Sequence, residues 1–275
     1  SPRLRDWLDP TNTHTTLDGY DPYATPAPGV LVKCRVFLEG PFDGSTLMNG
    51  TLRASGLVPT TEPYTALGYT HAGGGGGEVT TGTVLSGSGS NSIVDWVVVE
   101  LRDKNNSATV LASRSALLQR DGDVVDVNGT SDVSFNVLPD DYYIAIRHRN
   151  HLGAMTQNAQ ALSMTATLKD FSLAAGVALY GGSAAVKTIA TKQCLYAGDA
   201  TRNGQLKYTN SGNDRDPILS RIGGVVPTNT VNGYYAEDFN MDGVVKYSGT
   251  GNDRDMLLVN IGGSVPTSTL DQQLP

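Results

Sequence analysis

The sequence predicts a mainly β protein: a β-sandwich followed by a small repeat-containing module with short helices. Three observations support this prediction. The chain is rich in Gly, Thr, Ser, Asn and Val, and only 17% of its residues are charged, a composition that favours turns and strands over long helices. Short apolar runs with the alternation typical of strands occupy residues 30–168. A self-similar segment rich in oxygen-bearing side chains follows them.

The chain divides into three parts by composition. Residues 1–28 hold five prolines among Asp, Thr and Tyr without helical or strand periodicity, which predicts an N-terminal arm. Residues 29–192 form the predicted sandwich, and residues 39–92 within it are a long insertion rich in Gly and Pro. Residues 193–275 form the predicted module. A chain of 275 residues is long enough for two units, each with its own core.

The predicted strands are short apolar runs bounded by turn residues. Val97 and Val99 alternate with Val98 and Glu100, which predicts a strand with one better-buried face. Several such strands at short spacing are typical of a β-sandwich. The segment 133–142 indicates strand, turn and strand, and it resembles the closing hairpin of Ig-like domains, so we expect an Ig-like or jelly-roll-type sandwich. The predicted strands span residues 30–38, 93–101, 109–118, 124–127, 133–137, 142–147 and 161–168.

Two features of the sandwich have local interpretations. Cys34 and Cys194 lie at opposite ends of it, and they form either one disulfide or two buried free thiols. The five-glycine run 73–77 is followed by Glu78 and Val79 rather than by an amphipathic helix. This context argues against a phosphate-binding loop and favours a flexible or tightly packed one.

The strongest signal is a repeat at an offset of 39 residues, since Asp199 returns as Asp238. The match continues through a glycine, a Lys-Tyr pair, a Gly-Asn-Asp-Arg-Asp motif and a Gly-Gly pair. Calcium takes six to eight oxygen ligands, and a loop with ligands at positions 1, 3 and 5, a glycine at 6 and a carbonyl at 7 supplies them from one tight turn. The sequence therefore predicts two calcium sites. Their candidate ligands in these positions are Asp199, Thr201, Asn203 and Gln205 in the first loop, and Asp238, Asn240, Asp242 and Val244 in the second.

The acid that closes each site is not at the EF-hand position. Position 12 is Asn210 in the first loop and Gly249 in the second, and neither supplies a bidentate carboxylate. The loops are therefore expected to be longer, with a closing acid just before the short helices predicted at 217–222 and 256–261. The candidate closing acids are Asp214 or Asp216, and Asp253 or Asp255. Each of these aspartates has a rival role as a helix N-cap.

This pair of loops resembles the dockerin-like calcium modules of secreted bacterial proteins. Residues 238–243 match the dockerin pattern well, whereas the first loop departs from it at Thr201 and Asn203. We expect the second loop to bind calcium more tightly, since affinity rises with ligand charge. Together with the segments 94–102, 113–123 and 142–150, the repeat looks like the C-terminal region of large extracellular bacterial proteins. The resemblance implies calcium binding and a location at the cell surface or in the matrix.

Charge and motifs exclude several functions. Acidic residues outnumber basic ones by 27 to 20, a net charge of −7, which argues against nucleic-acid binding. No apolar run is long enough to span a membrane, and no signal peptide opens the chain, so we expect any export signal to have been removed. The sequence has no GxSxG, HExxH, Walker or CxxC motif, and we expect a protein that is not an enzyme.

Other candidate functional groups lie in the sandwich. His148 and His151, close to Arg147 and Arg149, are interpreted as a solvated charged strand edge in preference to a zinc site. We expect exposed aromatic residues that could stack on sugars. Those considered are Trp7, Tyr20, Tyr23, Tyr64 and Tyr69.

The leading hypothesis is a secreted, calcium-stabilised structural or assembly protein of the cell exterior, which self-associates into filaments or tubes through its N-terminal arm. The first alternative is a carbohydrate-binding or adhesive module of a larger secreted protein. The second is dockerin-type docking to another extracellular protein. An enzyme whose site is assembled from scattered residues is the remaining alternative.

Overall fold

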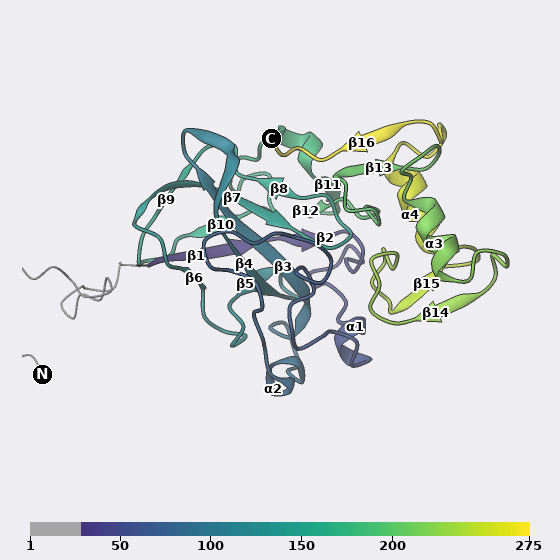
Figure 1. Cartoon of the computed structure of the whole chain (residues 1–275), viewed down its shortest axis with the longest axis horizontal. Coiled ribbons are helices and arrows are strands. Elements are labelled where there is room, and N and C mark those ends of the chain that lie inside the picture. The colour runs from purple at the N-terminus through teal and green to yellow at the C-terminus, as the bar shows by residue number, and fades with distance from the viewer. Residues whose placement is uncertain (1–28) are drawn as a thin grey trace, which may run out of the picture.

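The computed structural model describes residues 29–275, so the predicted arm lies outside the described residues. Figure 1 shows a large β-rich body and, beside it, a smaller C-terminal unit that carries the last two helices. The described part of the chain is mainly β, as the composition predicts. None of its helices is both long and apolar enough to cross a membrane.

A nine-stranded sheet forms the centre of the body. Its strands are β1 (Val30–Arg35), β3 (Ile93–Asp103), β4 (Asn106–Gln119), β5 (Asp123–Val125), β6 (Val133–Phe135), β7 (Asp140–Arg147), β8 (Ala154–Met155), β9 (Gln160–Leu162) and β10 (Leu168–Asp170). Their order is β10-β1-β5-β4-β3-β7-β8, with β6 also paired to β1 and β9 to β7. The β1–β10 pair is parallel and the other pairs are antiparallel.

A second, three-stranded sheet lies beside the first and leads to the C-terminal unit. It consists of β2 (Phe37–Leu38), β11 (Lys187–Ile189) and β12 (Lys192–Leu195), in the order β11-β12-β2. A short 3-10 helix, η3 (Gly182–Ala185), precedes β11. Because β12 pairs with β2 in parallel, it ties residue 194 back to the start of the body. The boundary predicted at residue 193 therefore falls inside a strand of the body.

Strand β3 is buried along both faces, whereas its alternating sequence predicted one better-buried face. It lies between β4 and β7, and the insertion 39–92 covers it. The hydroxyl of Tyr64 in the insertion donates to the carbonyl of Trp96, and the Trp96 indole donates to the carbonyl of Pro59. These bonds satisfy the polar groups that the insertion buries against β3.

The insertion contains two one-turn helices, α1 (Thr51–Ala54) and α2 (Gly82–Leu85), and no long strand. Its glycine run packs tightly against β4. A Cβ on Gly75 would lie 1.7 Å from the carbonyl oxygen of Ser113, and one on Gly73 would lie 2.7 Å from the Cβ of Ala112. Only glycine permits so close an approach of two backbones. Of the two interpretations of this run, the tightly packed loop is confirmed.

Six of the seven predicted strands agree with observed strands or strand pairs to within a few residues. The seventh predicted strand, 161–168, is not one strand: it includes the end of β9 and the first residue of β10. The hairpin predicted across residues 133–142 is wrong, because β6 pairs with β1 while β7 pairs with β3, β8 and β9. Neighbouring runs in the sequence thus belong to different pairings, which local patterns do not encode.

The two cysteines are free thiols. Both side chains are buried, Cys34 in β1 and Cys194 in β12. Burial raises the pKa of Cys194 to about 12 and that of Cys34 further. The thiols therefore act as small apolar core groups.

The C-terminal unit is built from two reciprocal halves. Its elements are β13 (Gln205–Lys207), α3 (Arg215–Arg221), β14 (Thr230–Asn232), β15 (Val244–Lys246), α4 (Asp253–Asn260) and β16 (Thr269–Asp271). The short strand within each predicted calcium loop pairs with the strand that ends the other repeat, β13 with β16 and β15 with β14. The registers match, since Lys207 pairs with Thr269 as Lys246 pairs with Thr230. Neither repeat therefore completes its ribbon alone.

The C-terminal unit has its own core and packs closely on the body. Phe239, Leu206, Val245 and Leu257 are fully buried in a cluster that also includes Leu152 of the body. A Cβ on Gly40 of the body would lie 2.0 Å from the carbonyl oxygen of Phe239. The body and the unit thus approach each other at backbone distance.

We expect Gly40→Ala to destabilise the protein by about 3 kcal/mol, the upper end of the range for overpacking, because the added methyl overlaps the Phe239 carbonyl. Urea unfolding followed by circular dichroism measures the change. Gly82→Ala is the control, since a Cβ there meets nothing within 4 Å, and it should change the free energy of unfolding by less than about 1 kcal/mol. Equal stability of the two variants would contradict close docking of the two units.

Candidate calcium sites in the C-terminal repeat

Two loops, residues 199–214 (loop one) and 238–253 (loop two), hold the predicted metal ligands. The first aspartate of each loop is hydrogen-bonded in the same way. Both carboxylate oxygens of Asp199 accept backbone N–H groups, from Gly204 at 2.9 Å and from the residue before it at 3.1 Å. Asp238 accepts from Gly243 at 2.8 Å and from the residue before it at 3.2 Å. The chain therefore wraps around these two carboxylates.

A second aspartate closes each loop. Oδ1 of Asp214 accepts both the backbone N–H and the hydroxyl of Thr201, at 3.0 and 2.9 Å, and its Oδ2 accepts the backbone N–H of Lys207. Asp253 likewise accepts two consecutive backbone N–H groups of loop two and the backbone N–H of Lys246. The closing carboxylate thus reaches back across the loop to its beginning.

A left-handed backbone turn shapes both loops. Arg202 and Met241, at the fourth position of each loop, both have φ +58°, and the glycines two residues later have φ +78° and +86°. Only glycine adopts such angles without strain. The two loops therefore fold back sharply in the same conformation, as the motif predicts.

The structure distinguishes between the alternative closing acids. Asp214 and Asp253 are fully buried within the loops. The side chains of Asp216 and Asp255 are 57% and 58% exposed and pair with the adjacent arginines, at 2.7 and 2.9 Å. The geometry thus places Asp214 and Asp253 towards the loop interior and the other two outside it.

The helix caps come from neighbouring asparagines. Asn213 Oδ1 accepts the backbone N–H of Asp216 at 2.8 Å, and Asn252 Oδ1 accepts that of Asp255 at 2.9 Å. An asparagine in this position satisfies one of the free N–H groups of the first turn. Asp214 and Asp253 therefore do not serve as side-chain caps, and their carboxylates remain in the loops.

Burial raises the pKa values of all four carboxylates. Burial, followed by the nearby charge of Asp238, raises the pKa of Asp253 to about 8. Burial and the charge of Asp199 raise the pKa of Asp214 to about 7. The pKa of Asp238 rises to about 6, chiefly through burial, although Arg149 opposes the shift. Among residues 29–275, none of the four forms an ion pair with a Lys, Arg or His side chain.

The remaining predicted ligands are more exposed. Asn203 Oδ1 and Asp242 Oδ1 each accept the N–H of the residue at position 7, both at 2.8 Å. Asn240 Nδ2 donates to Asp242 Oδ2 at 3.2 Å. The side chain of Gln205 is turned towards Asp271, at 2.6 Å, so only its backbone carbonyl is a candidate ligand. Val244 likewise offers only its carbonyl.

This donor set fits calcium. Every candidate ligand is an oxygen, and hard cations prefer carboxylate, amide and carbonyl oxygens. Paired buried carboxylates without a basic partner are costly unless a cation balances them. Loop two contributes three carboxylates, from Asp238, Asp242 and Asp253, whereas loop one contributes two, from Asp199 and Asp214. The expectation that loop two binds more tightly keeps its physical basis.

Asn150, which follows shortly after the end of β7, bonds to both loops. Its carbonyl oxygen accepts the N–H groups of Gly198 and Asp199, at 2.9 and 3.1 Å. Its side-chain Nδ2 donates to the carbonyl of Asp238 at 2.6 Å. One fully buried residue of the body thus holds the first residue of both loops. Sequence reasoning missed Asn150 because it lies outside the repeat and carries no motif.

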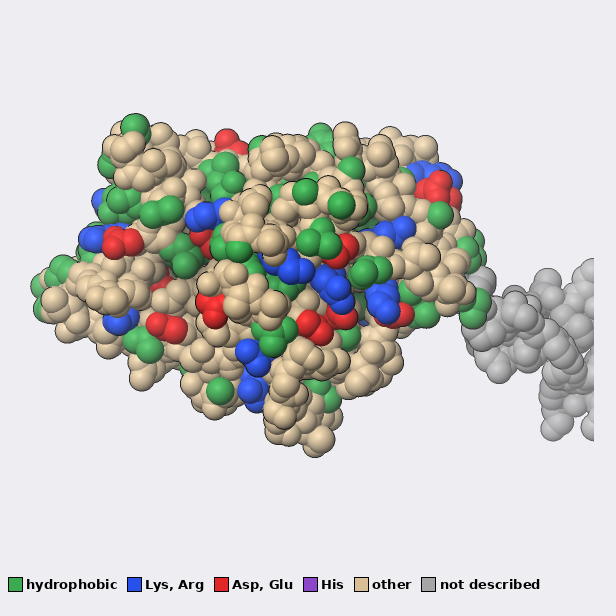
Figure 2. All heavy atoms as spheres, turned by 180° about the vertical axis from the view of Figure 1, so that it is seen from behind, with side chains coloured by type: hydrophobic (Ala, Val, Ile, Leu, Met, Phe, Trp, Pro, Cys, Tyr) green, Lys and Arg blue, Asp and Glu red, His purple; other side chains and the backbone are tan. Residues whose placement is uncertain are grey.

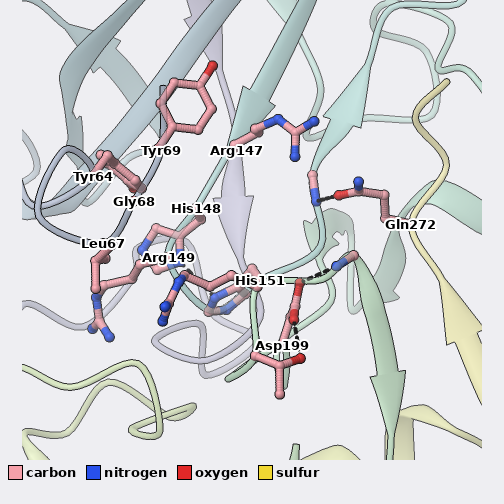
Figure 3. Close-up of a pocket in the computed structure, with 14 residues that line it drawn as sticks. Tyr64, Leu67, Gly68, Tyr69, Arg147, His148, Arg149, His151, Asp199 and Gln272 are labelled. Carbon is pink, nitrogen blue, oxygen red and sulfur yellow. Dashed lines mark hydrogen bonds between the residues drawn. The ribbon is translucent and has the colours of Figure 1, made fainter. Parts of the chain in front are cut away.

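The histidine pair is not a solvated strand edge; that prediction is wrong. His148 and His151 are buried where the body meets the C-terminal unit. Figure 3 shows them grouped with Arg149, and Asp199 lies beside them. Together they line a cavity of about 310 Å³. The C-terminal unit covers the segment that follows β7, and the sequence of β7 alone does not predict this contact.

Hydrogen bonds assign both histidines as neutral. Gly40 N–H donates to His151 Nε2 at 3.1 Å, so His151 carries its proton on Nδ1, which lies 3.0 Å from His148 Nδ1. His148 Nε2 lies 3.1 Å from Asp95, whose carboxylate also pairs with Arg149 at 2.9 Å. Burial lowers the pKa of both imidazoles. A second proton on His148, at Nδ1, would place that N–H directly opposite the Nδ1–H of His151.

Comparison of the sequence and the structure with known protein families, with curated proteins and with solved structures found no match. The site is therefore interpreted from its own geometry.

The raised carboxyl pKa values predict proton release when calcium binds. In the metal-free fold the pKa values of Asp238, Asp214 and Asp253 lie near 6, 7 and 8, above the usual 3.8. These groups therefore destabilise the metal-free fold increasingly as the pH rises from about 4 to 8. At pH 7 calcium should displace about one to two protons per chain, and almost none at pH 9. Calorimetry in buffers of different ionisation enthalpy measures this number.

Asp253→Asn should remove the larger part of the proton release at pH 7, because the pKa of Asp253 is the highest of the three. Asp255→Asn is the matched control and should release as many protons as the unmodified chain, since the pKa of Asp255 is already below its usual value. A heat of calcium binding that does not depend on the buffer would show that the aspartates are ionised before calcium arrives.

Proposed function

We propose that this protein is a secreted, calcium-stabilised structural protein of the cell surface or extracellular matrix. Two calcium ions, one in each loop, order the C-terminal unit and hold it on the β body. Through this rigid pair of units the protein self-associates or binds another extracellular protein. It has no catalytic role in this proposal.

The observation that supports the proposal is the burial of two aspartate pairs in reciprocal loops. Asp199 with Asp214 and Asp238 with Asp253 are each at most 5% exposed. Each pair lies where the loop motif expects its first and last ligands. The repetition of the arrangement in two halves argues for a common ligand, because an incidental cluster has no reason to recur with the same hydrogen bonds.

Hydrogen bonds connect the C-terminal unit, including its loops, to the body. Asn150 of the body bonds to both loops, and Asn260 of α4 donates to Glu39 and accepts from Lys187, both of the body. Calcium that binds only the folded loops stabilises every contact that depends on them. The expected consequence is cooperative stabilisation of the body and the C-terminal unit.

Exposed apolar side chains favour a protein partner. Val225 is 84% exposed, Val259 59%, Val265 51% and Val226 45%. Val226 and Val265 are equivalent residues of the two repeats, in the turns after α3 and α4. Apolar residues exposed on one small unit suit either self-association or dockerin-type docking. On the face shown in Figure 2, side chains of opposite charge lie next to one another, unlike a nucleic-acid-binding surface.

The carbohydrate-binding alternative receives less support. Tyr64 is only 4% exposed, so the prediction of an exposed aromatic ring there is wrong. Tyr69 is half-buried, and its hydroxyl donates to Glu100 at 2.8 Å. Trp7, Tyr20 and Tyr23 lie outside the described residues.

For the body we propose the Ig-like or jelly-roll type of sandwich. The short antiparallel strands and the second sheet beside the first support this assignment.

Calcium should raise the melting temperature of the chelated protein. At a concentration of 100 times the dissociation constant, one site adds about 2.7 kcal/mol to the free energy of unfolding. Asp253→Asn should lose most of the calcium-dependent rise, whereas Asp255→Asn, two residues away and exposed, should keep it. Differential scanning calorimetry with and without EDTA measures both. Identical melting curves in EDTA and in millimolar calcium would rule the proposal out.

Electron microscopy tests the assembly part of the proposal. We expect filaments, tubes or other regular assemblies of the full chain in calcium, and their loss in EDTA. Val226→Ser combined with Val265→Ser should reduce assembly without changing the calcium-dependent melting temperature. Monodisperse single particles under both conditions would leave the calcium sites in place and refute self-association.

A further inference from the structure

The insertion 39–92 brings two glutamates together across a short antiparallel pairing. Thr61 and Val79 form an isolated bridge, and the N–H of Glu62 donates to the carbonyl of Glu78 at 2.9 Å. The side chain of Glu62 is 1% exposed and that of Glu78 is 7% exposed. Like charges opposite each other on paired strands are destabilising, and burial increases the cost. Something of opposite charge is needed between them.

The protein supplies little positive charge at this place. Glu78 has Arg114 as a partner, with Nε 3.5 Å from Oε1. Glu62 has no Lys or Arg partner among the described residues, and His71 Nε2 lies 3.8 Å from its Oε2. The carboxylate oxygens of Glu62 instead accept the backbone N–H groups of Tyr64, Thr65 and Gly77, at 2.7, 3.1 and 3.1 Å, and these groups carry no full positive charge.

His71 is held with one ring nitrogen facing the glutamates. Its Nδ1 bonds to the Oγ of Ser113 at 3.2 Å, and that Oγ also accepts the N–H of Ala72. A serine oxygen has two acceptor sites, so the Oγ of Ser113 also accepts the Nδ1–H of His71, and Nε2 keeps its lone pair for a ligand. Nε2 makes only a long contact, 3.5 Å, with the Oγ of Ser115. Metal-binding histidines likewise donate the N–H of their second ring nitrogen to a fixed acceptor.

The glycine run encloses this group. A Cβ on Gly76 would lie 3.0 Å from the His71 ring, so a side chain there would press on the imidazole. Both oxygens of Glu78 accept the Gly76 N–H, and Glu62 accepts that of Gly77. Beside the loop is a cavity of about 360 Å³, lined by four of these glycines and by Glu78 and Arg114. The run thus orients both carboxylates and leaves an approach from solvent.

We propose that Glu62, His71 and Glu78 bind a first-row divalent transition-metal ion such as Zn²⁺. One ligand atom from each residue lies within 4.8 Å of the other two, close enough for a single ion to contact all three. One imidazole and two carboxylates suit zinc and its neighbours better than calcium, which prefers oxygen alone. The cavity beside Glu78 leaves room for a water as a further ligand. The site is separate from the calcium loops and does not depend on them.

Cobalt is the probe, because Co²⁺ takes zinc sites and absorbs visible light when nitrogen and oxygen ligands hold it. The full chain is freed of metal with a chelator and dialysed into excess calcium, so that the loops are filled, and Co²⁺ is then added. We expect one equivalent to bind with a visible absorption band. Competition with a chromophoric chelator gives the dissociation constant, and Zn²⁺ should displace the cobalt.

Three variants locate the ion. His71→Ala should abolish the band and weaken Co²⁺ binding by about 100-fold or more, and Glu78→Gln, which keeps the side-chain shape, should weaken it by at least about tenfold. Asp43→Asn, which changes an exposed carboxylate of the same insertion, is the control and should bind Co²⁺ as the unmodified chain does. The calcium-dependent rise in melting temperature, which the variants should retain, monitors the loops separately.

If the unmodified chain binds no Co²⁺ in excess calcium, the proposal is wrong. It is equally wrong if His71→Ala and Glu78→Gln bind as tightly as the unmodified chain. Should His71→Ala fail to fold, the isosteric Glu78→Gln variant decides. Loss of binding in Asp43→Asn would place the ion elsewhere.

Discussion

The burial of four aspartate carboxylates in one small unit is the constraint on which the C-terminal structure depends. Each loop folds around its first aspartate, and its closing aspartate reaches back from the start of a helix. Backbone N–H groups solvate these carboxylates but carry no full positive charge, so burial, together with the repulsion within each pair, raises the pKa values of Asp214 and Asp253. A divalent cation in each loop would remove that repulsion. The other features of the loops leave the two buried carboxylates of each loop free to bind such an ion. The backbone turns sharply around them, asparagines cap the helices, and Arg215 and Arg254 pair with the exposed Asp216 and Asp255.

The reciprocal pairing of the repeats makes the two loops one unit. Each ribbon contains one strand from either half, so the loss of order in one loop disturbs the ribbon of the other. Asn150 extends this dependence to the body, because it bonds to the first residue of both loops. The buried network of Asp95, His148 and Arg149 lies next to it. Ordering of the loops is thereby coupled to the end of β7 and to the central sheet.

The sequence predicted what local patterns encode. The 39-residue repeat gave both loops, their turn glycines and the two helices, because ligand spacing and glycine positions are local properties. The repeat left Asp214 and Asp216 as alternative closing acids, since both lie at the start of the same helix. The hydrogen bond from the backbone N–H of Asp216 to Asn213, which places Asp216 outside the loop, is visible only in the structure. The false hairpin at 133–142 and the buried histidines have a common cause: strand partners and the covering of β7 are set by residues far away in the chain. Asn150 and the Glu62–His71–Glu78 group likewise depend on long-range contacts without a sequence motif.

The most direct test of the central claim is to count the calcium ions that the folded chain holds. Equilibrium dialysis against radioactive calcium, with the full chain at neutral pH, gives this number without any assumption about stability. We predict two ions per chain, with the tighter one in loop two. Asp253→Asn should remove the tighter ion and Asp214→Asn the weaker one. A folded protein that holds no calcium at millimolar concentration would show that the buried aspartate pairs are balanced in another way, and would contradict the claim.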